Sequence, residues 1–136
     1  MATLKEALTT IIQADITSAA AGSLGVLLGY NAVTKPNCFF FQNPPDEPSL
    51  PVLNYAIVTQ AGFFPRDIFF GFTAWGNNFE AVLARLFALL HKRRQITATD
   101  YSVKAVLFDG SGPDLWEEDW KCYYRQDRYR IIVAEL

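Results

Sequence analysis

The stretch DIFFGFTAWGNNFEAVLARLFALLHKRR, residues 67–94, contains the two elements from which the rest of the fold follows. Its first eight residues alternate between two partly apolar faces, which predicts a central β-strand with neighbours on both sides. After Gly76 the period becomes helical, and Asn77 is the expected N-cap, with Glu80 three residues later. The apolar stripe of this helix comprises Phe79, Val82, Leu83, Leu86, Phe87, Leu89 and Leu90. The junction thus predicts a strand followed directly by a capped helix that covers one face of a sheet.

The same order of strand, small turn and helix occurs in nucleotide-binding folds and in hydrolase nucleophile elbows. Here the turn has one glycine, and the patterns G-x-G-x-x-G, G-x-x-x-x-G-K and G-x-S-x-G are all missing. Glu80 also places an acid in the first helical turn, where it competes with a bound anion for the backbone amides. We therefore interpret the junction as architectural.

Before this junction the sequence predicts one helix and two strands. A T-L-K-E capping box begins at Thr3, so we expect a helix from Leu4 to Ala14. The segment 16–36 has no clean period and predicts a loop with one short helical piece. Strands are expected at Cys38–Gln42 and at Val52–Gln60, separated by a connector with four prolines. In the second strand Leu53, Tyr55 and Ile57 should share one face, and Asn54, Ala56 and Val58 the other.

After the junction two further strands are expected. Ser102–Phe108 alternates, with Val103, Ala105 and Leu107 on one face. A last strand is marked by alternating apolar residues up to Glu135, whereas LWEEDWKCYY, residues 115–124, fits either a turn or an edge strand. The predicted fold class is α+β, a mostly antiparallel sheet with two main helices packed on one face, in a single domain over residues 1–136. We expect its core to contain Phe70, Phe72, Leu83, Leu86 and Leu90, with Leu8 and Ile11 against the same sheet face.

The composition narrows the function classes. Charged residues make up 19% of the 136 residues and the net charge is −2, which gives no reason to expect sequence-specific nucleic-acid binding. No apolar run of about 18 residues is present, so no membrane span is expected. The N-terminus lacks the apolar region of a signal peptide. Cys38 and Cys122 are the only cysteines, and so few predict a reduced, cytosolic compartment without a disulfide.

Candidate chemical groups are few. His91 is the only histidine and stands near a helix end without a local catalytic or zinc-binding signature. The acids of Glu117–Asp119 lack the spacing of a calcium loop and suit a solvated tip. The basic cluster Arg125–Arg130 contains Asp127 and suits surface ion pairing. We therefore expect no catalytic, cofactor-binding or metal-binding residues.

Aromatic residues are the more informative group. Eleven phenylalanines in 136 residues are many for one small core. The sheet face with Phe69, Thr73 and Val58 has no evident covering helix, and further aromatic side chains flank prolines or acids. The residues expected at an interface with another subunit or a partner protein are Phe63, Phe64, Phe69, Trp116, Trp120 and Tyr124.

Three stretches together carry a family resemblance. These are FFQNPPDEPSLPVLNYAIVTQ, FFGFTAWGNNFEAVLARLFALL and the closing YRIIVAEL, preceded by the short N-terminal helix. In this order they resemble the tail terminator (tail completion) proteins of long-tailed bacteriophages, over about Leu4 to Leu136. The Gly/Ala-rich segment 16–36 departs from that pattern.

The resemblance implies a small α+β subunit that assembles into a ring, typically a homohexamer. Such a ring caps the tail tube, ends tail growth and meets the head-completion protein, so its location is the virion at the head–tail junction, after assembly in the host cytoplasm. DNA passes through such a ring without being read. The family offers no catalytic residues to carry over. Two alternatives stay open: a head–tail connector or neck subunit, and a small enzyme whose Tyr, Asp and Glu side chains converge only in space.

Overall fold

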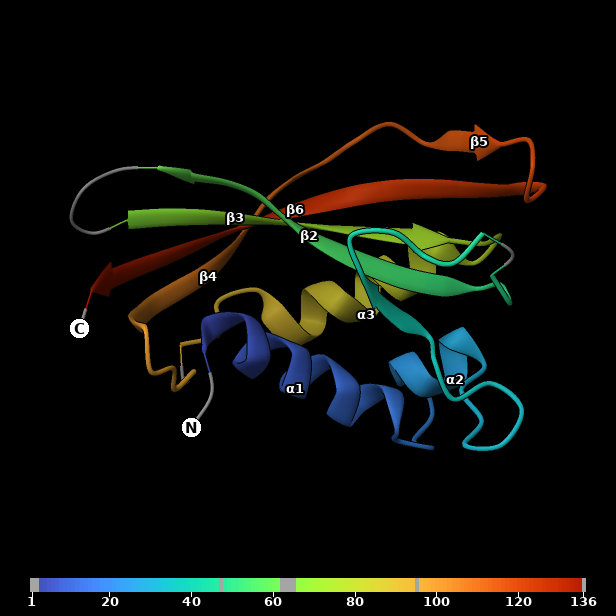
Figure 1. Cartoon of the computed structure of the whole chain (residues 1–136), viewed down its shortest axis with the longest axis horizontal. Helices are drawn as coiled ribbons and strands as arrows, with labels where there is room; N and C mark the ends of the chain where they lie inside the picture. The colour runs from blue at the N-terminus through green and yellow to red at the C-terminus, as the bar shows by residue number, and fades with distance from the viewer. Residues whose placement is uncertain (1–2, 47, 62–65, 95, 136) are drawn as a thin grey trace.

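The computed structural model describes all residues except 1–2, 47, 62–65, 95 and 136. Helices lie against one face of a twisted sheet, with the β5–β6 end of the sheet on the far side from them (Figure 1). The elements, in chain order, are α1 (Leu4–Ile16), α2 (Leu24–Leu28), β1 (Phe39–Phe41), β2 (Val52–Ala61), β3 (Arg66–Trp75), α3 (Phe79–Leu90), β4 (Tyr101–Ser111), β5 (Leu115–Glu117) and β6 (Cys122–Glu135). The predicted α+β class is confirmed.

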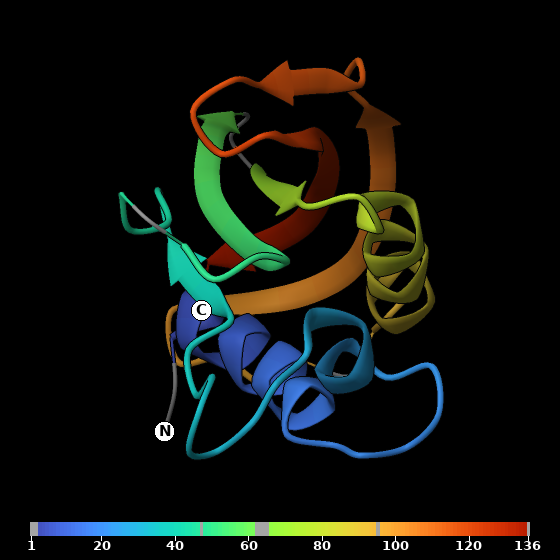
Figure 2. The same ribbon diagram turned by 90° about the vertical axis from the view of Figure 1, so that its right-hand side faces the viewer.

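The sheet has the strand order β1-β2-β3-β6-β4, and β5 pairs with β6 beside the end of β4. Only β1 and β2 are parallel, while the other pairs are antiparallel. β3 therefore lies at the centre, as its two apolar faces predict. Figure 2 shows how strongly the strands twist relative to one another above α1.

The core lies between the helices and the sheet. On β3, Ile68, Phe70 and Phe72 are buried, and the first two lie opposite core residues of β6 in the register Ile68↔Ile131 and Phe70↔Tyr129. From α1, Ile12 is fully buried whereas the predicted Ile11 is only partly buried. The helical residues buried against the sheet are Leu4, Leu8, Ile12, Ile16, Phe79, Val82, Leu83, Leu86 and Leu90.

The predicted cap of α3 is wrong by one residue. Asn78, not Asn77, occupies the N-cap position, and its side chain makes no capping hydrogen bond. Instead Asn78 Nδ2 donates to the Leu27 carbonyl at 2.7 Å, which ties α3 to the C-terminal end of α2. The side-chain amide of Asn78 is thus oriented by a tertiary contact through its nitrogen, and its oxygen, the atom that accepts in a cap, makes no capping hydrogen bond. Gly76 has φ +134°, so the turn before α3 does need a glycine.

A β-bulge changes one of the predicted strand faces, and a sheet edge changes the burial on another. Ala105 and Leu107 of β4 were expected to share the face of Val103. The register instead shifts between Val103 and Ala105, so the buried Val106 lies opposite Ile131 in the core. In β2, Ile57 lies opposite Phe70, on the predicted face, yet it is 47% exposed because β1 ends beside Tyr55 and leaves this part of β2 at an edge.

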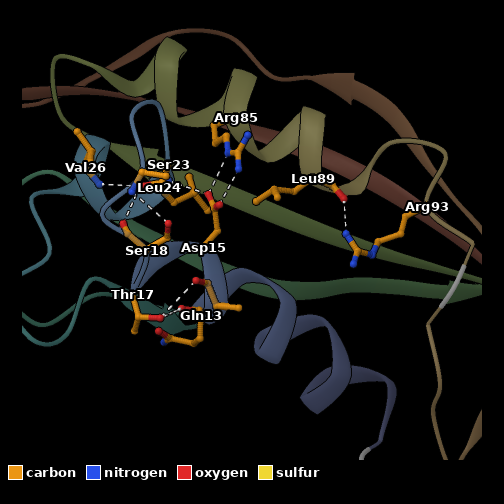
Figure 3. A network of polar contacts seen from close by, with 12 residues as sticks. Gln13, Asp15, Thr17, Ser18, Ser23, Leu24, Val26, Arg85, Leu89 and Arg93 are labelled. Carbon is orange, nitrogen blue, oxygen red and sulfur yellow. Dashed lines mark hydrogen bonds and ion pairs between the residues drawn. The ribbon is translucent and has the colours of Figure 1, made fainter.

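The segment 16–36 contains α2, the single short helix that was expected, and it is held by polar contacts. Asp15 accepts from Arg85 Nε at 3.0 Å and Nη2 at 2.6 Å, and from the Leu24 amide at 2.8 Å (Figure 3). Lys35 Nζ donates to the carbonyls of Leu28 and Pro51, at 2.7 Å each. One carboxylate thus joins α1, α2 and α3, and one ammonium joins the end of α2 to the proline-rich connector.

Candidate interface surfaces

The β5–β6 hairpin, residues Leu115–Tyr124, carries the most exposed aromatic pair. Trp116 lies opposite Tyr123 in the register of β5 and β6, with ring centroids 4.8 Å apart. Trp116 is 46% exposed and Tyr123 is 48% exposed. Leu115, on the other face of the same short strand, is 43% exposed. We call residues Leu115–Tyr124 the aromatic hairpin.

The turn of the aromatic hairpin is fixed by its own polar groups. Trp116 Nε1 donates to Glu118 Oε2 at 2.9 Å, and Glu118 also pairs with Lys121. The Asp119 amide donates to Glu117 Oε1 at 3.2 Å. The hydrogen bond from Lys121, and then that from Trp116, lowers the pKa of Glu118 below its ordinary value. The tip is therefore a hydrogen-bonded turn in which the Trp116 indole and Lys121 both contact Glu118.

A second aromatic cluster joins the hairpin to the sheet. Trp75 stacks on Tyr124 at 4.1 Å and meets Trp120 edge-on at 4.8 Å between ring centroids. Trp120 Nε1 donates to the Asp46 carbonyl at 2.8 Å, which anchors the proline-rich connector. Trp120 and Tyr124 are thus half-buried within one subunit, whereas Trp116 points away from it.

In its described part, the sheet face opposite the helices has polar side chains beside its apolar ones. Thr73 is only 7% exposed, and Gln126 lies within 3.5 Å of its hydroxyl, so this part of the face is covered within the chain. The guanidinium of Arg128 lies 5.6 Å from the centroid of the Phe69 ring. The expectation of an uncovered apolar face is therefore wrong at Thr73, and Phe69 is partly buried beneath an arginine.

The basic cluster of β6 forms the ion pairs that the sequence predicted. Arg128 pairs with Asp109 at 3.1 Å, and Arg130 pairs with Asp67 at 2.9 Å. On the core face Arg125 lies 3.4 Å from both Asp114 and the buried Asp127. These contacts neutralise the cluster within the subunit, which favours a structural role over phosphate binding.

A second basic region follows α3 and lies along the edge of β4. Val106 exchanges backbone hydrogen bonds with this segment: Lys92 N donates to its carbonyl at 2.7 Å, and its amide donates to Arg93 O at 3.1 Å. The Phe108 amide donates to His91 Nδ1 at 3.0 Å. The only histidine is therefore engaged in covering the strand edge, and its ring stacks on the 40% exposed Phe87 at 4.5 Å.

Among the described residues, one tyrosine hydroxyl with a raised pKa is enclosed in the core. Tyr129 is fully buried, and burial, followed by the nearby charge of Asp127, raises the pKa of its hydroxyl. A phenol enclosed in this way has no access to a substrate. Within the described ranges no three His, Cys, Asp or Glu side chains are grouped so that they could hold a metal ion. Cys38 and Cys122 are both buried as free thiols. No helix in the described part of the chain is long and apolar enough to cross a membrane.

Neither a protein-family model nor a curated protein matches the sequence. Among solved structures, a chain from the virion of a native gene transfer agent particle has the same fold, with a TM-score of 0.61 at 12% sequence identity. The match covers 97% of this chain and 95% of that chain. The arrangement of helices and strands is thus shared from end to end by a protein of a virion.

The predicted interface residues fall into three groups. Phe63 and Phe64 lie outside the described residues. Phe69, Trp120 and Tyr124 are engaged in contacts within the subunit, while Trp116 presents an exposed ring. Leu115, Tyr123 and Phe87 are further exposed apolar side chains that the sequence did not single out. The position of Tyr123 could have been predicted by reading residues 115–124 as a hairpin. A tight turn centred on Asp119 and Trp120 places Tyr123 beside Trp116.

Proposed function

We propose that this chain is a structural subunit of a virion. The observation that carries the proposal is a fold shared with a virion chain over 97% of this chain and 95% of the other. The absence of grouped metal ligands among the described residues is compatible with this role.

Within a virion, the role that we propose is a tail terminator that forms a ring on the end of the tail tube and stops its growth. The support is the sequence resemblance, together with a subunit that presents an aromatic pair, Trp116 and Tyr123, on a fixed hairpin. Aromatic side chains on a preorganised element are typical anchors of protein interfaces. The proposed partners are further copies of this chain, most simply in a hexamer, then the tail tube protein and the head-completion protein. DNA would pass through the opening of the ring.

Elongation of tail tubes tests this role directly. Purified tube protein of the same virus is allowed to polymerise, and tube lengths are measured by electron microscopy with and without the purified chain. A terminator should bind the tube end and stop further growth. Trp116→Ala should weaken this effect, by about tenfold or more if the indole is a hot spot. Val33→Ala, which changes a side chain that is 88% exposed outside the regular elements, serves as the matched control and should have no effect.

A subunit that leaves tube growth unchanged would refute the terminator role. Binding to portal-side protein instead of tube ends would favour the second candidate, a head–tail connector or neck subunit. A chain that binds neither component would refute the virion role as a whole.

A further inference from the structure

The aromatic hairpin is strongly acidic at its tip. Between Asp114 and Lys121 the chain has four acids and one lysine, and of the acids Asp114 is paired with Arg125. Glu118 and Asp119 are exposed, and a hollow beside them is lined by Asp46, Glu117, Asp119 and Trp120. The surface therefore combines two exposed aromatic rings with several negative charges, and the charges exceed what Lys121 neutralises.

A surface of opposite character lies along the edge of β4. We call Phe87, Lys92, Arg94 and Lys104 the basic edge; all four side chains are exposed. Residues 81–99 contain no acid, so no carboxylate of that segment neutralises this charge. The backbone hydrogen bonds between Val106 and residues 92–93 hold this segment beside β4, and Lys104 stands two residues before Val106. The basic edge is thus held in place by the fold, as the aromatic hairpin is.

The two surfaces lie far apart on the subunit. Figure 1 shows the β5–β6 hairpin at one end of the long axis, whereas β4 begins near the other end, beside the C-terminus. They cannot meet within one chain in this arrangement. A closed ring of three or more copies needs two different patches on every subunit, one for each neighbour. Here the two patches have complementary charge, and both contain apolar groups.

We propose that the aromatic hairpin of one copy docks on the basic edge of a second copy, with Trp116 and Tyr123 against the region of Phe87. This inference rests on the proposed function, since it assigns the contact that closes the ring. Charge complementarity fixes the direction of docking, because a hairpin on a hairpin or an edge on an edge would bring like charges together. The desolvated aromatic rings would supply most of the affinity.

Reciprocal charge reversal tests the contact. One variant carries Glu118→Lys and Asp119→Lys, and the other carries Arg94→Glu and Lys104→Glu. Self-association of each protein is measured by sedimentation velocity and native mass spectrometry from micromolar to millimolar concentration. Circular dichroism checks that both variants fold. We expect each variant alone to associate at least about tenfold more weakly than the wild type, because both place like charges in the contact.

The equimolar mixture of the two variants gives the decisive result. Each junction in an alternating assembly then joins a positive hairpin to a negative edge, or a negative hairpin to a positive edge, so association should return. Closed assemblies of the mixture should contain only even numbers of copies. The docking proposal is refuted if both folded variants associate like the wild type, or if mixing them does not restore association. The proposed function is tested separately, by the capping of tail tubes. A wild-type chain that stays monomeric over the whole concentration range also refutes the docking proposal, whatever the tube assay shows.

Discussion

Asp15 offers the sharpest test of how the three helices are joined. Its carboxylate, 10% exposed, accepts two hydrogen bonds from Arg85 and one from the first amide of α2, at 2.6–3.0 Å. Asp15→Ala removes all three. A hydrogen bond to a charged group contributes about 1.5–3 kcal/mol, but Arg85 is 36% exposed and regains water when its partner is lost. We therefore expect the free energy of unfolding to fall by about 2–4 kcal/mol, less than the sum of three separate bonds.

Urea unfolding followed by circular dichroism measures this change. Arg85→Ala and the double variant complete a cycle, and their coupling with Asp15→Ala should be about 1–3 kcal/mol. Asp46→Ala is the matched control, because its exposed side chain takes no part in these contacts, and it should stay within about 0.5 kcal/mol of the wild type. A loss below about 0.5 kcal/mol for Asp15→Ala would refute the claim that this carboxylate joins the helices.

The same carboxylate gives a pH dependence with a definite sign. The hydrogen bond from Arg85 lowers the pKa of Asp15 below its ordinary value of 3.8, against the opposing effect of burial. A lowered pKa in the folded state means that the stabilisation is present above pH 3.8 and is lost as pH falls through the folded-state value. Asp15→Asn should therefore be less stable than the wild type at neutral pH, and the difference should shrink in acid.

Three further changes test the packing, each by the free energy of unfolding in urea. Leu86→Ala should cost about 2–5 kcal/mol because the side chain is fully buried under the sheet, and a cost near zero would show that the helix face is misassigned. Gly25→Ala should cost at least about 2 kcal/mol, since a Cβ there would lie 2.0 Å from the Ile16 carbonyl oxygen, and a neutral result would contradict the close approach of α1 and α2. Asn78→Ala should cost about 1 kcal/mol through its bond to Leu27, whereas the exposed Asn77→Ala should be neutral within about 0.5 kcal/mol; the reverse order would restore Asn77 as the cap.

Elements with a long, unbroken period could be predicted from the sequence. α3 and the central strand β3 lie where the stretch 67–94 places them, because each repeats its apolar spacing over most of its length. The β-bulge at Lys104 could not be predicted in this way. Nothing in the alternation around it marks one residue as extra, and the shift is set by pairing with β6. The cap of α3 is decided in a similar way, by the distant Leu27 carbonyl and not by the local N-N-F-E pattern.

The surroundings of the candidate interface residues also depend on distant contacts that the local sequence does not show. The expected uncovered sheet face depends on what surrounds Thr73, and one of its contacts comes from Gln126, its partner on β6, 53 residues later. Trp116 and Trp120 look alike in the sequence, since both flank the same three acids. Their difference arises from strand pairing, which sets Trp116 beside Tyr123 at the surface, and from a connector carbonyl, which engages Trp120.

This difference between the two tryptophans separates folding from assembly in the hairpin. Trp120 and Tyr124 pack on Trp75 and hold the base of the hairpin on the sheet, so their contacts are made in a single subunit. Trp116 contacts mainly Tyr123 and Glu118, and almost half of its surface stays in water. An indole contributes most to the free energy of binding when the interface removes it fully from water. In the free subunit this contribution of Trp116 is not made. The contacts at the base of the hairpin thus order it already in the free subunit. A partner that covers Trp116 therefore gains apolar contact without the entropy cost of ordering the hairpin.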